Sequence, residues 1–351
     1  HVTRPCWLWI PVHGKPRLLV SFVDQGRFSH LGIETTLFVN RQDMSYKLMQ
    51  ILGGPGRIAM EYSPDGALPR ISNVDAGTLE MVRGLGAEVI SSADLLQYAT
   101  QRWDRTQLQS HMFAAAKLTQ IVHEAFQFIG ESLSLEPTEH DVAQFIRERF
   151  CAEGLLVTDG PTVAANEHAS DPHFDPTPEN SVTIKQGDWV LIDLWTRLPE
   201  EDAMYGDITW TAYVGEEVPA RNNKVFRAVV GARDAALNEL DAAFRDQRQL
   251  QGWQLDKIAR DYIDSAGFGG YFNHRLGHSL GHEVHSNAVN LDGWETHDTR
   301  PIIPGIALTI EPGIYLPDFG VRSEIDVFVS EDGPVVTTQM QRDVVRISSG
   351  T

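Results

Sequence analysis

The chain has little cysteine and little positive charge. Cys6 and Cys151 are the two cysteines among 351 residues, and they lie far apart in the sequence. Disulfides accumulate in oxidising compartments, so this scarcity favours a reducing one, and we expect a cytoplasmic protein. Lysine and arginine number 29 against 48 aspartates and glutamates, which gives a net charge of −19. Without a basic face for phosphates or anionic lipids, we expect neither nucleic acid nor a membrane as partner.

The sequence also lacks long apolar runs, internal repeats and low-complexity segments. No stretch approaches the roughly 20 apolar residues that a membrane-spanning helix needs. The glycine-rich turn Gly53-Gly54-Pro55-Gly56 has no following Lys-Ser/Thr pair, so it does not match a phosphate-binding loop. His282-Glu283 has Ser286 in place of the second histidine of an HExxH zinc helix. What remains is a globular protein of ordinary composition, 42% hydrophobic and 22% charged.

The first hundred residues alternate between apolar runs and helical patterns, which predicts a small α/β domain. This alternation stops near Gln101–Asp104, and we place a domain boundary there. Residues 1–104 are expected to form the first domain and residues 105–351 the second. The predicted elements of the first domain are the strands Leu18–Val23, Arg57–Tyr62 and Glu88–Ile90 and the helix Ala76–Leu85.

The second domain combines long helical patterns with strand-like runs, which predicts an α+β fold. In its first helix, Leu118, Val122 and Ile129 recur on one face, and Gly130 is expected to end the helix. Thr138 precedes the next helix and forms a capping signature with the residues that follow it. We predict helices over 107–129, from 139 onward, over 222–244 and over 254–266, and strands over 189–195, 208–214, 306–310 and 325–329.

Asp193 and Asp207 lie at the ends of two strand-like runs. Asp193 ends the apolar run Trp189–Ile192, where a carboxylate is costly unless it is paired or binds a metal. Asp207 begins the next predicted strand. If the strands are adjacent and antiparallel, the two carboxylates come together and repel one another unless a cation lies between them. For Asp193 alone, the alternative is an ordinary carboxylate that caps a loop at the strand end.

Four histidines occur within His274–His285. His274 and His278 are four positions apart, but Gly277 and Gly281 break helical spacing, so the two need not face the same way. A single histidine is more often a core residue with satisfied hydrogen bonds than a ligand. Four in so short a stretch favour catalysis or metal binding.

Two glutamates complete the candidate set. Glu311 follows a strand-like run and precedes Pro312-Gly313, which fixes its position at the strand end. Alternation along one strand would place Arg322, Glu324 and Asp326 on the same face. Arg322 would then compensate the charge of Glu324, and the alternative is a surface salt bridge between strands.

Four carboxylates and one imidazole suit a pair of fairly hard divalent cations with carboxylates in the bridging positions. Such a pair activates water at neutral pH and polarises a carbonyl oxygen. Mn²⁺ is the favoured ion, with Zn²⁺ or Co²⁺ as alternatives. The set consists of Asp193, Asp207, His278, Glu311 and Glu324.

In their order along the chain, these motifs resemble the pita-bread metallopeptidases, which include methionine aminopeptidase, aminopeptidase P and prolidase. The likeness spans nearly the whole chain, because the first domain is similar to that of the creatinase, prolidase and aminopeptidase P branch. It implies a creatinase-like pita-bread catalytic domain preceded by a smaller α/β creatinase-type domain. The motifs are Asp193, Asp207-Ile208-Thr209, His274 with His278 and His285, Glu311-Pro312-Gly313, and Arg322 two residues before Glu324.

The resemblance implies how the metals would be held. Asp193 would bind one ion and His278 and Glu311 the other, while Asp207 and Glu324 would bridge them. The supporting residues implied are Arg322 beside Glu324 and Thr209 beside Asp207.

The resemblance also implies catalytic roles. Glu311 would carry a proton from water to the leaving nitrogen, and His285 would stabilise the tetrahedral oxyanion. His173 would lie over the substrate. His274 would line the pocket for the residue after the scissile bond.

Some features depart from the family pattern. The arginine that clamps a dipeptide's carboxylate in some prolidases has no clean match, and the loop Trp294–Arg300 offers His297 and Arg300 instead. Trp210 stands where many prolidases carry arginine. His168 is an additional histidine, which we interpret as a surface residue. These differences leave the length of the substrate open.

The resemblance implies a homodimeric enzyme that hydrolyses peptides with proline after the scissile bond. We favour an Xaa-Pro dipeptidase (prolidase), because the compact chain has little extra sequence for extended subsites. The alternative is an Xaa-Pro aminopeptidase (aminopeptidase P) acting on longer peptides. Methionine aminopeptidase generally lacks the first domain. A metal-free creatinase-like or binding relative would have lost the ligands, and all five are present here.

Overall fold

The computed structural model of the protein describes residues 4–54 and 56–348; Pro55, in the expected glycine-rich turn, lies outside them. The chain forms two compact units. One runs up to Pro64 and resumes over Ile71–Ser92, and the other contains Asp65–Arg70 and the chain from Ala93 onward.

The division after Ser92 differs from the boundary placed at residue 104. The segment in question includes helix α3 (Ala93–Thr100), which belongs to the second unit because buried Gln97 bonds to it. Its Nε2 donates to the carbonyl of Pro301 at 2.9 Å, and its Oε1 accepts from the backbone N–H of Val289 at 2.6 Å.

The first unit is an α/β arrangement with two small sheets. Strand β2 lies between β1, to which it is antiparallel, and β3, to which it is parallel, while β4 and β5 form a parallel pair. The predicted strand Leu18–Val23 ends earlier, because Ser21 caps a 3-10 segment that begins at Phe22. The elements are β1 (Trp7–Trp9), β2 (Arg17–Ser21), β3 (Glu34–Phe38), α1 (Arg41–Leu52), β4 (Arg57–Met60), α2 (Ala76–Gly84) and β5 (Glu88–Ser91).

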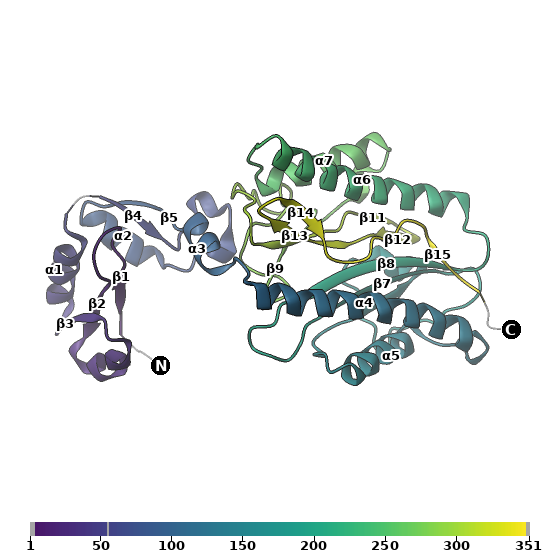
Figure 1. The fold of residues 1–351 in the computed structure, drawn as a ribbon, viewed down its shortest axis with the longest axis horizontal. Helices are drawn as coiled ribbons and strands as arrows, with labels where there is room; N and C mark the ends of the chain where they lie inside the picture. The colour runs from purple at the N-terminus through teal and green to yellow at the C-terminus, as the bar shows by residue number, and fades with distance from the viewer. Residues whose placement is uncertain (1–3, 55, 349–351) are drawn as a thin grey trace. The chain divides into compact units, whose positions relative to one another are not determined.

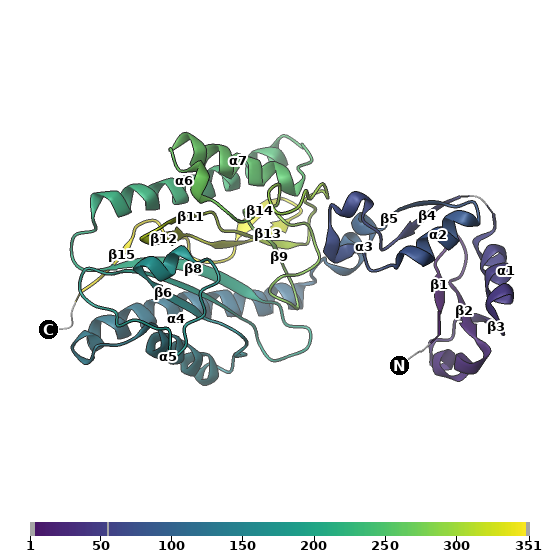
Figure 2. The same cartoon turned by 180° about the vertical axis from the view of Figure 1, so that it is seen from behind.

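In the second unit, helices cover two facing layers of strands. Helices α4 and α5 lie along one side of the strands and α6 and α7 along the other, as opposite views show (Figures 1 and 2). One sheet has the strand order β15-β8-β7-β6 and the other β14-β13-β10-β9, and β11 and β12 form a hairpin. The helices are α4 (Arg105–Ser132), α5 (Glu139–Ala152), α6 (Ala220–Arg245) and α7 (Gly252–Ser265). The strands are β6 (Thr162–Ala165), β7 (Trp189–Thr196), β8 (Gly206–Val214), β9 (Ser279–Leu280), β10 (Ala307–Ile310), β11 (Gly313–Leu316), β12 (Phe319–Arg322), β13 (Ile325–Ser330), β14 (Gly333–Val336) and β15 (Val345–Ile347).

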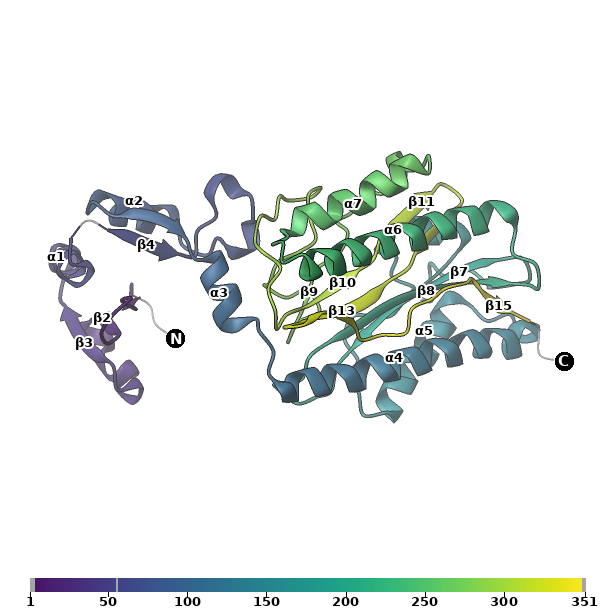
Figure 3. The same cartoon turned by 45° about the horizontal axis from the view of Figure 1, so that its top comes forward.

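Each sheet buries its apolar face against its own helices. Leu118 of α4 shares a cluster with Ile192 of β7, whereas Val229 of α6 shares another with Leu308 of β10 and Val327 of β13. The tilted view shows α4 and α6 running along the two sheets (Figure 3). The polar ends of strands from both sheets are thereby left to meet in the interior between them.

The long predicted helices are confirmed, with one instructive difference. Thr138 caps α5 through a reciprocal pair of hydrogen bonds with Asp141. Helix α4 does not stop at Gly130 but continues to Ser132. A Cβ at Gly130 would lie 2.6 Å from the backbone oxygen of Ser348, so glycine serves there the close approach of the C-terminal segment.

Over residues 4–54 and 56–348, no helix combines the length and the apolar character that crossing a membrane requires. Both cysteines, Cys6 and Cys151, are free and exposed.

Candidate metal centre

Asp193 and Asp207 lie on adjacent antiparallel strands, as the sequence predicted. The register of β7 and β8 pairs Asp193 with Thr209 and Trp195 with Asp207. The two carboxylates are therefore diagonal neighbours on the same face of the sheet. The backbone N–H of Asp207 donates to Oδ2 of buried Asp326 at 3.0 Å, which fixes the start of β8 against the second sheet.

The second sheet supplies the other three candidate ligands, each at a strand end. His278 precedes β9, Glu311 follows β10, and Glu324 lies between β12 and β13. Because β9 and β13 both pair with β10, the three residues come together. The backbone N–H of Glu324 donates to the carbonyl of Thr209 at 3.1 Å, which ties this group to the first sheet.

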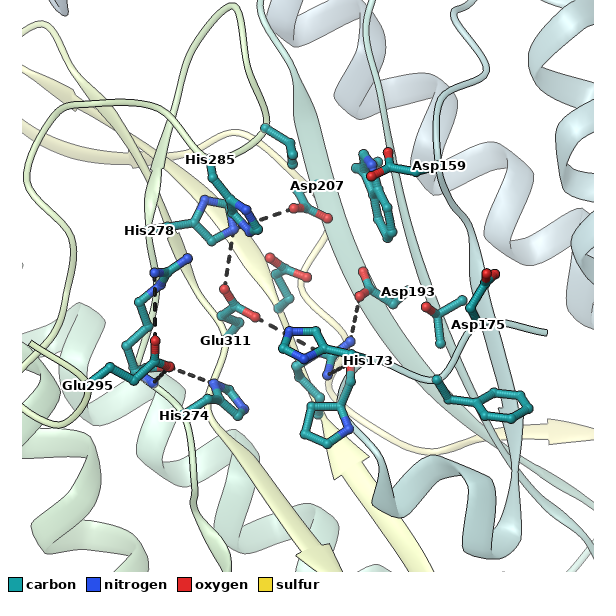
Figure 4. Close-up of a pocket in the computed structure, with 18 residues that line it drawn as sticks. Asp159, His173, Asp175, Asp193, Asp207, His274, His278, His285, Glu295 and Glu311 are labelled. Carbon is teal, nitrogen blue, oxygen red and sulfur yellow. Dashed lines mark hydrogen bonds and ion pairs between the residues drawn. The ribbon is translucent and has the colours of Figure 1, made fainter. Parts of the chain in front are cut away.

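All five side chains line one cavity of about 420 Å³ (Figure 4). Nε2 of His278 lies 3.6 Å from Oδ2 of Asp207 and 3.4 Å from Oε1 of Glu311. One potential ligand atom from each of Asp207, His278 and Glu324 lies within 4.8 Å of the others. The chain thus gathers in space the residues that the sequence scatters over more than a hundred positions.

The carboxylate oxygens of this group fit divalent cations. Asp193 Oδ1, Asp207 Oδ1 and Glu324 Oε1 are buried and have no hydrogen-bond donor among the residues that the structure describes. A buried acceptor without a partner costs about 1–3 kcal/mol, and more when it is charged. Cations that prefer oxygen ligands satisfy such atoms.

Burial and mutual repulsion raise the pKa values of these acids. The pKa of Asp207 lies well above its usual range because the group is desolvated and faces Glu324 and Asp193. The pKa of Glu324 is raised for the same reasons, with Glu311 as its strongest repelling neighbour. Burial raises the pKa of Glu311 to about 7, although Arg322 opposes the shift. The positive charge of bound cations would lower these pKa values again and would offset the repulsion between the carboxylates.

The histidine of the set presents the nitrogen that a metal needs. Nδ1 of His278 lies 3.2 Å from the carbonyl of Ser279, which can only accept, so Nδ1 carries the proton. Nε2 then has a free lone pair facing Asp207 and Glu311. Burial lowers the pKa of His278 well below its usual value, which keeps the imidazole neutral.

Arg322 and Thr209 support the ligands, but not as the alternation argument predicted. That argument required one continuous strand, whereas Ser323 and Glu324 interrupt it between β12 and β13. The Arg322 guanidinium donates to Asp193 Oδ2 instead, and its Nε donates to the hydroxyl oxygen of Thr209 at 3.0 Å. Thr209 in turn donates to Glu324 Oε2 at 2.8 Å. Arg322 therefore reaches Glu324 through Thr209.

Three further histidines line the cavity around Glu311 (Figure 4). Nδ1 of His274 donates to the carbonyl of Arg275 at 2.7 Å, so Nε2 accepts from the hydroxyl of Tyr315 at 2.8 Å. Burial lowers the pKa of His274 to about 3 and that of His285 to about 4, so both rings are neutral at pH 7. The ring of His285 meets that of His278 edge-on, with centroids 4.3 Å apart. His173 is exposed at the cavity wall.

Residues 110–331 match the model of metallopeptidase family M24. The chain belongs to this family. The fold and the enzyme class that the sequence motifs predicted are therefore confirmed. Peptidases of family M24 use divalent metals.

The M24 relatives extend the comparison to both units. YkvY of Bacillus subtilis is 36% identical over 184 residues, which are 52% of this chain and 46% of that protein, so the match spans about half of YkvY. The protein named "Probable dipeptidase PepE" of Mycobacterium tuberculosis is 27% identical over 334 residues, 94% of this chain and 81% of that one. The crystal structure of dipeptidase PepE from Mycobacterium ulcerans shares the fold, with a TM-score of 0.70 at 24% identity over 97% of this chain and 86% of that one. Solved structures named prolidase and X-Pro aminopeptidase also share this M24 fold.

Arg300 and His297 do not line the cavity of this M24 enzyme. The Arg300 guanidinium is buried and donates to Asp298 at 3.0 and 2.6 Å and to the carbonyl of Asn287 at 2.6 Å. His297 is exposed, and its ring packs 5.1 Å from that of Trp253. Both were expected to contact the substrate, and a structural partner holds each of them outside the cavity.

The sequence reasoning overlooked a different pair. Arg275 and Glu295 line the cavity, and the backbone N–H of Arg275 donates to Glu295 Oε1 at 3.0 Å. Arg275 lies inside the histidine-rich stretch, so its proximity to the ligands was a usable signal. Glu295 lies in a loop, and nothing in the sequence connects it to Arg275.

His168 is not the surface residue that we expected. Its side chain is 24% exposed, and Nδ1 lies 2.9 and 3.0 Å from the two carboxylate oxygens of Glu139. Glu139 is fully buried and also accepts from the backbone N–H groups of Ala165 and Val182. The His168 ring stacks on Phe174 with centroids 4.3 Å apart, and Phe174 lines the M24 cavity.

We expect His168→Ala to raise KM several-fold while metal content stays unchanged. Phe174 would lose the ring that fixes it, and the neighbouring His173 would move with it. Glu139 would lose a hydrogen-bond partner, which lowers the free energy of unfolding by about 1–3 kcal/mol. His168→Phe is the matched control, because it keeps the stacking and removes the bond to Glu139. Steady-state kinetics and thermal unfolding measure both effects, and an unchanged KM in the alanine variant would remove His168 from substrate positioning.

Proposed function

We propose that this M24 enzyme is a two-metal Xaa-Pro dipeptidase. The observation that carries the proposal is the convergence of four carboxylates and one neutral imidazole on one cavity, with three buried carboxylate oxygens left without a donor in the described chain. This ligand set suits two hard divalent ions, with Mn²⁺ favoured and Zn²⁺ or Co²⁺ as alternatives.

The residues divide between the two ions as the family resemblance implies. Asp193 would bind one, His278 and Glu311 the other, and Asp207 and Glu324 would bridge. The bound ions would supply a nucleophilic water at neutral pH and a Lewis acid for the scissile carbonyl.

Glu311 is the proton carrier in this proposal. Its Oε1 accepts from the hydroxyl of Thr309 at 3.1 Å, which fixes the carboxylate beside His278. Glu311 would accept a proton from water and pass it to the leaving nitrogen of the substrate. The neutral ring of His285, next to His278, is placed to donate a hydrogen bond to the oxyanion that develops on the substrate. His173 and His274 would contact the substrate on either side of Glu311.

Several features support a dipeptide over a longer peptide. The cavity of about 420 Å³ is at the small end of ligand sites and has room for a short substrate. The PepE relatives are named as dipeptidases. The alternative is an Xaa-Pro aminopeptidase, an activity named for one solved structure of this fold.

A cytoplasmic homodimer is also part of the proposal. The two free cysteines accord with a reducing compartment. Leu8 of the edge strand β1, and Ile10 and Val12 in the segment that follows it, have exposed fractions of 54%, 67% and 93%. Exposed apolar side chains beside an edge strand form a surface that a second copy can cover.

The test compares an Xaa-Pro dipeptide with the matching Xaa-Pro-Xaa tripeptide on metal-stripped protein, with and without Mn²⁺. We expect hydrolysis of the dipeptide, restored by Mn²⁺. Preference for the tripeptide would establish the aminopeptidase instead. Cleavage of neither substrate, with metal bound, would reject both assignments.

A further inference from the structure

The cavity carries two guanidinium groups among the residues that the structure describes, and they differ in how they are engaged. Arg322 is buried and donates to Asp193, Thr209 and Tyr315. Arg275 keeps 20% of its side chain exposed, and in the described chain its guanidinium has one ion-pair partner, Glu295, at 3.9 Å. An arginine has five N–H donors, so Arg275 retains donors that can turn to a ligand.

The support of this pair is rigid. Asp292 is fully buried and accepts from the backbone N–H groups of Trp294 and Glu295, both at 2.9 Å. The Arg260 guanidinium lies over the rings of Phe272 and Trp294 at 4.2 and 4.6 Å. Arg260 also donates to the backbone of the segment that leads into Arg275, at the carbonyl of Phe272. Glu295 and Arg275 therefore face one another from two fixed segments.

The charges in the cavity are distributed unevenly. Glu295 and His274 lie on one side of Glu311, and Asp159, Asp175 and Asp193 lie on the other (Figure 4). The positive charge of Arg275 lies close enough to Glu311, His278 and His285 to lower the pKa of each. A negatively charged group of a substrate would therefore meet an available cation, Arg275, on the side of Glu311 where Glu295 and His274 lie.

We propose that Arg275 binds the free C-terminal carboxylate of a dipeptide substrate and that Glu295 is the built-in carboxylate which occupies this arginine before substrate arrives. The inference rests on the proposed Xaa-Pro dipeptidase and assigns the group that selects dipeptides. Planar guanidinium matches a carboxylate with two parallel hydrogen bonds, which an amide or a further residue does not offer. The α-ammonium end of the same substrate would lie towards the aspartate side of the cavity.

With Arg275 in this position, the chain does not need an arginine on the loop Trp294–Arg300 to bind the substrate carboxylate. Arg300 is fully committed to Asp298 and Asn287. The loop contributes Glu295 instead, and the cation comes from the residue next to His274. A longer peptide would bring a neutral amide to Arg275 and would also have to pass Glu295.

The experiment compares an Xaa-Pro dipeptide with its C-terminal amide, Xaa-Pro-NH₂, on the Mn²⁺-loaded enzyme. We expect Arg275→Gln to raise KM for the dipeptide about 10- to 100-fold, with a much smaller change for the amide. Because the charge of Arg275 also acts on Glu311, kcat changes for both substrates. The diagnostic quantity is therefore the ratio of kcat/KM for dipeptide and amide.

Two further variants sharpen the result. Glu295→Gln removes the competing carboxylate and keeps its shape, so it should lower KM for the dipeptide and leave the ratio high. Arg275→Lys keeps the charge without the planar fork and should fall between the parent and Arg275→Gln. Metal content and thermal unfolding of each variant establish that the site and fold are retained.

The outcomes separate this inference from the proposed function. If the parent enzyme cleaves dipeptide and amide equally well, or if Arg275→Gln affects both equally, Arg275 does not bind the carboxylate, although Xaa-Pro hydrolysis stands. If the Mn²⁺-loaded parent cleaves no Xaa-Pro substrate, the proposed function itself has failed.

Discussion

Glu324→Gln is expected to abolish hydrolysis and to lower metal content while the fold stays intact. Glu324 is 1% exposed, its Oε1 has no donor in the described chain, and its Oε2 accepts from Thr209. Glutamine keeps the volume, but its amide nitrogen is not a ligand and the bridging charge is lost. Because Lewis-acid stabilisation is worth several kcal/mol, we expect kcat/KM to fall at least about a thousand-fold.

In the absence of metal, Glu324→Gln should not lower the stability of the protein, although it lowers activity and metal content. Glu324 is repelled by Glu311 and Asp193 in the metal-free site, so its neutralisation relieves that repulsion. The metal-free variant should therefore unfold at the same or a higher temperature than the metal-free parent, and it should gain less from added Mn²⁺. Glu331→Gln, at a side chain that is 77% exposed, is the matched control. Full turnover by the Glu324 variant would contradict the two-metal assignment.

The candidate ligands could be selected from the sequence because local signals mark most of them. Asp193 follows the apolar run Trp189–Ile192 within β7, Asp207 lies at the start of β8, and Glu311 precedes a Pro-Gly pair. These are local signals, and the structure brings all of them to one cavity. The long helices were readable for the same reason, since a 3.6-residue apolar period over many turns is a strong pattern.

What the sequence did not predict depends on contacts between distant segments. Strands β6, β11, β12 and β14, of four residues each, were not predicted. The partner of Arg322 changed from Glu324 to Asp193 because the expected strand is interrupted between β12 and β13. The bond of His168 to buried Glu139 joins residues 29 positions apart, a separation that no local pattern encodes.

Acid is expected to destabilise the protein through its buried neutral histidines, and His111 gives the sharpest test. His111 is fully buried on α4; its Nδ1 donates to the carbonyl of Tyr205 at 2.7 Å, and its Nε2 lies 2.6 Å from the hydroxyl of Thr337. Burial lowers its pKa to about 4 from an ordinary value of 6.5. Between these values the unfolded chain binds a proton that the folded chain does not.

The sign of the effect follows from this difference in bound protons. The free energy of unfolding is unaffected by His111 above pH 6.5 and falls as the pH drops towards 4, by about 1.4 kcal/mol per pH unit or about 3 kcal/mol in all. His274, with its pKa lowered to about 3, acts in the same direction. Asp207 and Glu324 oppose them in the metal-free protein, because acids with raised pKa values bind protons in the folded state.

Comparison of His111→Gln with the parent at each pH isolates the contribution of His111 from the others. Glutamine loses part of the hydrogen bonding, so the variant should be about 1–2 kcal/mol less stable at pH 7.5. Its stability should then fall less steeply than that of the parent between pH 6.5 and 4, measured by urea unfolding. His13→Gln, at an exposed histidine, is the matched control. Equal slopes for His111→Gln and the parent would show that His111 gains its proton without unfolding.

The location of His111 makes the result relevant to catalysis. His111 bonds to Tyr205, directly before β8 and two residues before Asp207, and lies 3.9 Å from Asp326, the acceptor for the Asp207 N–H. We expect protonation there to loosen the start of β8, which carries Asp207, the proposed bridging ligand.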